Sequence, residues 1–182
     1  IIIKSKRISR YMSYKPIIIV SGDPKSVFLE IFFKSIKEKK IKSPIILICS
    51  KNLLKKNMRR FNFKKKIKLL KSSQIQKFRL NNSSINLIDI KLNKNIGINQ
   101  YIEKSFFTAF KIINDGITNK FINGPISKKK FLKKKYLGIT EYICDHFSIK
   151  KKAMLIYNKN LSVCPITTHV PIKQVTKKIS KK

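Results

Sequence analysis

Three short turns carry the residues of this chain that could do chemistry. SGDP (21–24) follows an apolar run and offers one carboxylate, and NGPISKK (123–129) follows another. TTHVP (167–171) places His169 after two hydroxyl side chains and before a proline that can begin a helix. Because an imidazole can ligate a divalent metal or act as a general base, His169 is a candidate for either role, with a structural histidine as the alternative.

The NGP turn suggests the binding of an anion. Gly124 lets the backbone come close to a ligand, and Pro125 is expected to begin a helix. The unpaired N–H groups in the first turn of such a helix attract phosphate, with Ser127 and Lys128 beside it. A purely structural turn is the alternative. SGDP matches neither the GxGxxG dinucleotide pattern nor the P-loop pattern, and we interpret it as structural.

Strands that alternate with helices have to position these turns. The β-branched runs at 16–22 and 44–50 predict buried strands, and a short helix is predicted over 51–61. Between the two strands, a 3.6-residue repeat predicts a helix with Pro24 in its first turn and with an apolar face made of Val27, Phe28, Ile31, Phe32 and Ile36.

The clearest helix is predicted over 98–116, with Gly116 as its C-terminal cap and an apolar stripe of Ile102, Phe106, Ala109, Phe110 and Ile113. Another helix is predicted through His146, whose side chain should be solvated because it does not share a helix face with the adjacent Asp145.

Shorter apolar runs complete the pattern. Strands are predicted at 65–70 and 85–90, with an irregular connection over 71–84, and a helix is predicted after Pro171. Two further apolar runs, 151–158 and 161–169, are separated by a turn. Strands that alternate with helices favour an α/β layered fold with a mainly parallel sheet.

Composition limits the class of protein. The 182 residues suit one domain, and the 42% hydrophobic fraction argues against disorder. The three cysteines stand far apart and predict neither a disulfide framework nor a zinc site, which favours the reducing cytoplasm. No apolar run approaches the roughly 20 residues of a membrane span, so a soluble protein is expected. Residues 1–11, which precede Met12, are interpreted as an upstream or disordered segment.

The formal net charge of +35 suggests a different function, the binding of nucleic acid. However, lysine is spread over nearly every segment together with isoleucine and asparagine, and arginine is scarce. A drift toward A/T-rich codons produces this mixture without a polyanionic partner, and no nucleic-acid-binding motif is present. A basic nucleic-acid-binding protein is therefore kept as an alternative that the sequence does not favour.

Taken in order, three motifs resemble the 4-hydroxythreonine-4-phosphate dehydrogenase (PdxA) family. NGPISK resembles the family's Thr-Gly-Pro turn with its lysine, GITEY its Gly-His-Thr-Glu turn, and TTHVP the strand that ends in Thr-Thr-His. The strand and SGDP turn near the start also resemble the family's first strand and its Gly-Glu-Pro turn. The order and spacing of these motifs are more specific than any one of them.

The resemblance implies a fold and a reaction. The fold would be the α/β fold of isocitrate and isopropylmalate dehydrogenases, in a cytoplasmic homodimer. The reaction would be the oxidation of 4-phosphooxy-L-threonine by NAD or NADP, followed by decarboxylation, in vitamin B6 biosynthesis. A divalent metal, which could be Zn, Mg or Co, would polarise the substrate's oxygen. A related dehydrogenase that acts on four-carbon sugar-acid phosphates, such as threonate or erythronate phosphate, is the alternative.

The resemblance also assigns residues. His169 matches the family's first metal ligand, and Thr140 matches a threonine that contacts the phosphorylated substrate. Ile139 stands where the family has a substrate-binding histidine, while Gly124, Pro125 and Lys128 match the supporting turn.

Length is the largest departure from the family. Family members are about twice as long, and their C-terminal half supplies two more metal histidines and the cofactor contacts. Residues 12–182 are therefore expected to be the N-terminal part of such a dehydrogenase, inactive on its own because a catalytic metal needs about three protein ligands.

Overall fold

The computed structural model describes residues 14–77, 80–93, 95–132, 135–167 and 170–179. The chain forms two compact units, Ile1–Ser127 and Lys128–Lys182. The residues interpreted as an upstream segment, 1–11, lie outside the described part. No helix within the described ranges is long and apolar enough to cross a membrane.

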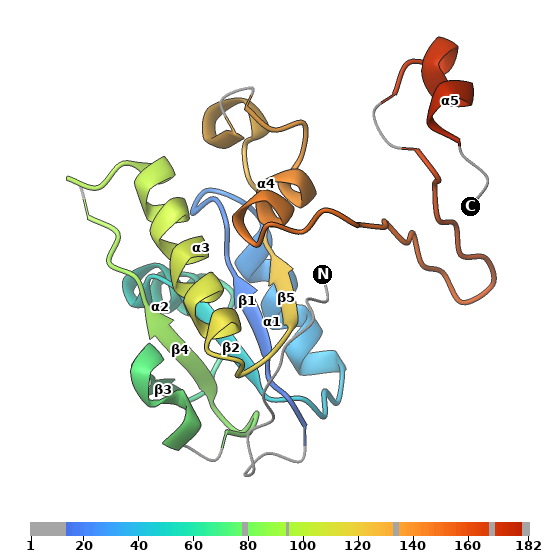
Figure 1. Ribbon diagram of the computed structural model, residues 1–182. Coiled ribbons are helices and arrows are strands. Elements are labelled where there is room, and N and C mark those ends of the chain that lie inside the picture. The colour runs from blue at the N-terminus through green and yellow to red at the C-terminus, as the bar shows by residue number, and fades with distance from the viewer. Residues whose placement is uncertain (1–13, 78–79, 94, 133–134, 168–169, 180–182) are drawn as a thin grey trace. The chain divides into compact units, whose positions relative to one another are not determined.

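A five-stranded sheet forms the centre of the first unit (Figure 1). Its strands lie in the order β3-β4-β2-β1-β5, and every neighbouring pair is parallel. The predicted mainly parallel sheet is confirmed. The strands are β1 (Ile17–Val20), β2 (Ile45–Cys49), β3 (Ile67–Leu69), β4 (Ile85–Asp89) and β5 (Lys120–Asn123).

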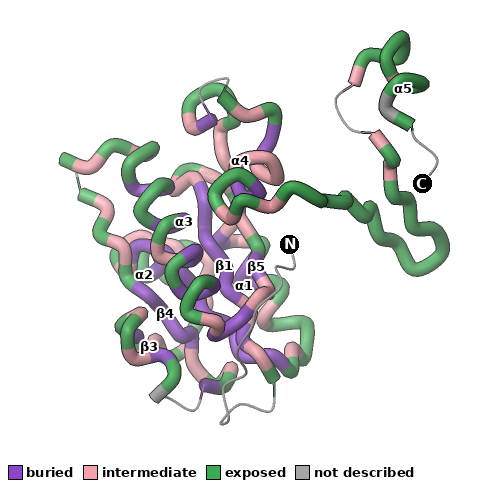
Figure 2. Tube along the Cα trace, viewed as in Figure 1, coloured by how far each residue is buried: buried purple, intermediate pink, exposed green. Residues whose placement is uncertain are grey.

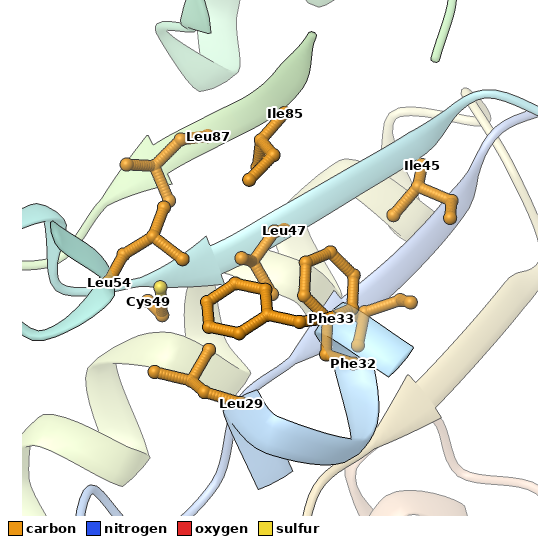
Figure 3. Close-up of a cluster of buried hydrophobic side chains, with 10 residues drawn as sticks. Leu29, Phe32, Phe33, Ile45, Leu47, Cys49, Leu54, Ile85 and Leu87 are labelled. Atoms are coloured by element: carbon orange, nitrogen blue, oxygen red, sulfur yellow. The ribbon is translucent and has the colours of Figure 1, made fainter. Parts of the chain in front are cut away.

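Helices cover both faces of this sheet. On one face, α1 (Phe28–Glu38) and α2 (Lys51–Arg60) share a buried cluster with every second residue of the strands, including Ile19 and Leu47 (Figure 3). On the opposite face, α3 (Ile98–Asn114) contacts β1 and β2, and its Phe106 ring lies 5.7 Å from that of Phe121. Phe121 pairs with Ile18, whose side chain points away from the first cluster.

The helix α1 begins later than the sequence predicts, and part of its predicted apolar face, Val27 and Ile31, is exposed, while Phe28, Phe32 and Ile36 pack at the buried cluster. Residues 23–26 form a turn in which Asp23 accepts hydrogen bonds from the backbone N–H groups of Lys25 and Ser26, so Pro24 precedes the helix. Leu29, Phe32 and Phe33 face the sheet, whereas Val27 and Ile31 are 61% and 54% exposed. The prediction of a buried Val27 and Ile31 is wrong, because periodicity alone does not show which side of a lysine-rich amphipathic helix meets the sheet.

The predictions for the next two helices are confirmed. All five residues of the predicted stripe on α3 are buried, and Gly116 has a φ of +75° just after the helix. The helix α2 begins after Ser50, whose hydroxyl accepts a hydrogen bond from the Leu53 N–H at 3.3 Å.

The segment predicted to be an irregular connection, 71–84, contains a 3₁₀ helix, η1 (Ser72–Lys77), and an asparagine that organises the sheet. The Asn82 side chain accepts a hydrogen bond from the Ile45 N–H and donates to the carbonyl groups of Ile41 and Ser43. The segment therefore holds the start of β2, a long-range role that the sequence does not show.

The second unit contains short helices and an extended segment. A single π-helical turn, η2 (Lys128–Leu132), contacts α4 (Ile139–His146), with the Phe131 and Tyr142 rings 5.4 Å apart. His146 ends α4 and is exposed, as predicted. The helix after Pro171 is also confirmed, as α5 (Ile172–Lys178). Between α4 and α5 the chain is mostly exposed (Figure 2).

Candidate functional site

The order of the strands points to one edge of the sheet. From β1 the chain passes through α1 to β2 on one side, and from β4 it passes through α3 to β5 on the other side of β1. The two connections lie on opposite faces, so the sheet has a topological switch point between β1 and β5 (Figure 1). In open α/β sheets, ligands bind at the carboxyl ends of the strands at such a point.

The SGDP and NGP turns meet at this switch point. The Gly124 N–H donates to the Val20 carbonyl at 2.7 Å, and the Asp23 N–H donates to the Pro125 carbonyl at 2.8 Å. A Cβ on Gly22 would lie 2.3 Å from the Pro125 oxygen, and a Cβ on Gly124 would lie 2.2 Å from the Ser21 oxygen. Gly22 also has a φ of +73°. Both positions therefore require glycine, because the two backbones touch.

A buried polar cluster lies beside the two turns. The Tyr101 hydroxyl on α3 accepts a hydrogen bond from the Ser50 N–H at 3.0 Å and lies 3.2 Å from the Ser21 hydroxyl. Burial raises the pKa of Tyr101 to about 12, so the phenol keeps its proton at neutral pH. Through these contacts the tyrosine joins the ends of β1 and β2. Sequence reasoning missed Tyr101, and no local pattern distinguishes it.

The carboxylates at this edge support the backbone. Asp89, at the end of β4, accepts a hydrogen bond from the Lys51 N–H at 2.8 Å and so holds the first turn of α2. Asp23 accepts from the Lys25 N–H, also at 2.8 Å. Because each carboxylate has a structural partner, the geometry supports the interpretation of SGDP as a structural turn.

The prediction that Pro125 begins a helix is wrong. Residues 124–127 are irregular, and the π-helical turn starts at Lys128, whose side chain is exposed. The physical reason is the hydrogen bond from the Asp23 N–H to the Pro125 carbonyl, which uses the oxygen that a helix would direct to a later N–H. Gly124 and Pro125 therefore hold the NGP turn against the SGDP turn, and no helix start that could bind phosphate forms at Pro125.

Ile139 and Thr140 stand in the first turn of α4, and both are partly buried. The buried Gly138 precedes them, and a Cβ there would lie 2.8 Å from the Glu141 Oε2 atom. The other Glu141 oxygen lies 3.7 Å from the Lys152 Nζ atom. The turn thus combines the N–H groups of a helix start, the Thr140 hydroxyl and a Glu141–Lys152 ion pair, groups that can bind a phosphorylated ligand.

The metal prediction falls on residues outside the described part. His169 and the preceding Thr168 are among them. Within the described ranges, no three His, Cys, Asp or Glu side chains are placed to hold a metal ion.

Fold and site together define a class, a doubly wound α/β protein whose strand-end turns converge at a switch point. A sequence model of the family described as pyridoxal phosphate biosynthetic protein PdxA matches residues 40–182. The chain belongs to the PdxA family, and the resemblance noted in its motifs is confirmed.

Individual proteins of this family are similar to the chain in sequence. A 4-hydroxythreonine-4-phosphate dehydrogenase from a Sulfurihydrogenibium species is 29% identical over 170 residues, covering 90% of this chain and 52% of the relative. The protein of the same name from Wigglesworthia glossinidia brevipalpis is 26% identical over 174 residues, again covering 90% and 52%. The chain therefore spans about half the length of these relatives.

Solved structures share the fold. The crystal structure of a 4-hydroxythreonine-4-phosphate dehydrogenase from Burkholderia phymatum aligns with a TM-score of 0.74 at 20% identity, covering 92% of this chain and 54% of that one. The Klebsiella pneumoniae dehydrogenase aligns with a TM-score of 0.73, also at 20% identity, covering 91% and 53%. The predicted dehydrogenase-type α/β fold is confirmed.

Proposed function

We propose that this chain supplies one half of a dehydrogenase that oxidises 4-phosphooxy-L-threonine in pyridoxal phosphate biosynthesis. The hydride acceptor would be NAD or NADP, the β-keto acid would then lose carbon dioxide, and the completed enzyme would be a homodimer. The family match carries this proposal, because residues 40–182 include the NGPISK, GITEY and TTHVP turns. The names of the relatives support the choice of substrate.

Substrate binding is assigned to the start of α4. Thr140 would contact the substrate phosphate together with the N–H groups of the first helical turn, and Lys152 could shift from Glu141 to the phosphate. The supporting observation is that Thr140 lies in the first turn of α4 and is partly buried there.

Ile139 gives a specific reason for a second candidate substrate. It occupies the same turn and is partly buried, but an isoleucine donates no hydrogen bond to a phosphate or hydroxyl group. A four-carbon sugar-acid phosphate, such as threonate or erythronate phosphate, has no amino group and therefore requires a different set of hydrogen-bond partners. The relative turnover of the two substrates by the completed enzyme decides between them.

His169 is proposed as one ligand of a catalytic divalent metal. Such a metal usually has about three protein ligands, and the described residues offer no set of that size. The residues described here do not by themselves fit a complete metal centre. We therefore propose that the remaining ligands lie in the half of the family fold that this chain does not span, and that the chain has no turnover without that half.

The test is a turnover assay on the completed enzyme, in which this chain is joined or mixed with the second half of the fold. We expect NADH or NADPH formation that stops on addition of a chelator and falls at least a hundredfold in His169→Ala. His146→Ala is the matched control, since His146 is the other histidine of the chain and is exposed at the end of α4. Equal activity in both variants would contradict the metal assignment.

A further inference from the structure

An open groove of about 900 Å³ lies between α2 and the edge strand β3, within the first unit. Five cationic side chains line this α2–β3 groove: Lys51, Lys55, Arg59, Lys64 and Lys65. No acidic side chain is among the described residues that line it. The ion pairs between described residues involve none of the five cations, and Asp89 accepts its hydrogen bond from the backbone N–H of Lys51. The groove therefore carries a positive charge that the protein itself does not neutralise.

Three of these cations form one row on α2. Lys51, Lys55 and Arg59 follow one another at positions i, i+4 and i+8, a spacing that places side chains on the same face of a helix. Like charges at i and i+4 destabilise a helix, and α2 contains no acidic residue that would offset them. An anion bound along the row would remove this repulsion.

A drift toward A/T-rich codons accounts for lysine in general but not for the local pattern of charge. Nine of the eighteen residues over 51–68 are lysine or arginine, against 43 of 182 in the whole chain. All eight acidic residues lie outside 39–88. Two of the five arginines, Arg59 and Arg60, are consecutive at the end of α2, and their planar guanidinium groups suit phosphate. Positive charge is thus concentrated where the groove lies.

Apolar side chains lie among the cations of the groove. Met58 and Phe63 line it from α2 and from the segment that follows, and Leu69, which is 50% exposed, lines it from β3. The partly buried Phe63 ring stacks on the buried Phe33 ring with the centroids 4.6 Å apart, so its position is fixed. A cationic groove that also presents aromatic and apolar side chains is typical of surfaces that bind single-stranded nucleic acid.

The charge and the shape of the groove argue against other occupants. Burial of unpaired ammonium and guanidinium groups is strongly unfavourable, so an apolar protein surface would not cover the groove. Its exposure therefore does not depend on the part of the fold that this chain does not span. A membrane surface is flat, whereas these cations line a hollow. A flexible strand of linked phosphates can enter a hollow and place charges beside several cations at once.

We propose that the α2–β3 groove binds the phosphodiester backbone of a single-stranded nucleic acid. Lys51, Lys55 and Arg59 contact successive phosphates, and Phe63 offers a surface on which a base stacks. None of the residues that line the groove belongs to the NGPISK, GITEY or TTHVP turns, so the inference does not rest on the proposed function.

The test measures the fluorescence anisotropy of a labelled oligouridylate as the full chain is added at several KCl concentrations. About five phosphate contacts predict a slope of about −3.5 for the logarithm of the binding constant against the logarithm of the salt concentration. The double variant Lys55→Gln/Arg59→Gln should weaken binding about tenfold or more and make the slope shallower by about 1.4, since two contacts are lost. Both side chains are exposed, so the variant should keep the circular dichroism of the chain.

The matched control is Lys104→Gln/Lys111→Gln, because both lysines are exposed on α3. Each double variant lowers the formal net charge by two, from +35 to +33, so general attraction by the charge of the chain changes equally. The control should therefore weaken binding by less than about threefold. Ultraviolet cross-linking of the unchanged chain, followed by mass spectrometry, should join uridine to Phe63 or Met58.

The inference is overturned if the two double variants weaken binding equally, because the charge would then act without a site. It is also overturned if no saturable binding occurs, or if the cross-links fall only outside residues 51–69. Displacement of the oligouridylate by a polyglutamate at an equal or lower concentration would assign the groove to an acidic protein segment and would likewise overturn it.

Discussion

Replacing Tyr101 with phenylalanine tests the buried polar cluster at the ends of β1 and β2. The change removes one hydroxyl and keeps the ring, so the packing of α3 is preserved. It leaves the Ser50 N–H, which donates to this hydroxyl at 3.0 Å, without its acceptor in a residue that is 2% exposed. An unsatisfied buried group of this kind costs about 1–3 kcal/mol. We expect the free energy of unfolding to fall by that amount.

Urea denaturation at neutral pH, followed by circular dichroism, measures this loss. The slope of the transition should stay unchanged while its midpoint falls. Tyr14→Phe is the control, since Tyr14 belongs to the same unit and is 46% exposed; its effect should stay within about 0.5 kcal/mol. If Tyr101→Phe shifts the midpoint no more than the control, the hydroxyl does not hold the strand ends and the assignment is wrong.

The same variant also tests how the free energy of unfolding depends on pH. Burial raises the pKa of Tyr101 from its ordinary value of 10.0 to about 12 in the folded protein. The folded state therefore favours the protonated phenol, and this contribution is complete below pH 10 and is lost between pH 10 and 12. At roughly 1.4 kcal/mol per pKa unit, the loss approaches 3 kcal/mol. Tyr101→Phe should show a shallower fall in stability over this range, and an unchanged slope would contradict the burial argument.

The remaining predictions concern the turns, the start of β2 and a buried thiol. Gly22→Ala should lower the free energy of unfolding, measured in urea, by about 2 kcal/mol or more, because Gly22 has a positive φ and a Cβ there would meet the Pro125 oxygen. Gly97→Ala is the control, because a Cβ at Gly97 meets no atom within 4 Å, and it should change the free energy by less than about 0.5 kcal/mol. Asn82→Ala removes three hydrogen bonds and should cost about 1–3 kcal/mol in the same assay, and a neutral result would refute its role. N-ethylmaleimide should modify the exposed Cys164 in the folded chain but Cys49 only in denaturant, because Cys49 is buried and burial raises the pKa of its thiol. Mass spectrometry measures the two rates, and equal rates in the folded chain would contradict this prediction.

The elements that could be predicted from the sequence are those whose stabilising contacts repeat along the chain. The β-branched runs of β1 and β2 and the five-residue stripe on α3 are such patterns, and the structure confirms them. The exposure of Val27 and Ile31 could not be predicted, because the apolar residues of this helix extend around it to Leu29 and Phe33, which pack on the sheet together with Phe32.

Long-range hydrogen bonds account for most of what the sequence could not show about the site. Tyr101 contacts Ser21 across 80 positions of the chain and Ser50 across 51, and Asn82 contacts Ile45 across 37. None of these pairs leaves a periodic or local pattern. The NGP turn was recognisable, but its partner, the SGDP turn, became part of the site only because β1 and β5 are neighbours in the sheet.

The motif order, by contrast, was informative because it does not depend on three-dimensional detail. The turns at Gly124 and Thr140 and the strand end at His169 follow one another as in the PdxA family, and the family match over residues 40–182 includes all three. The roles of Thr140 and His169 are predictions that the fold does not test.

The most direct test of the central claim is the rate of NADH or NADPH formation from 4-phosphooxy-L-threonine by this chain combined with the second half of a PdxA relative. The same assay is run on each half alone. Our account predicts turnover by the combination and none by either half. Turnover by this chain alone would contradict the assignment of the missing metal ligands to the second half. An assembled, folded combination that forms no NADH or NADPH from this substrate would contradict the proposed function.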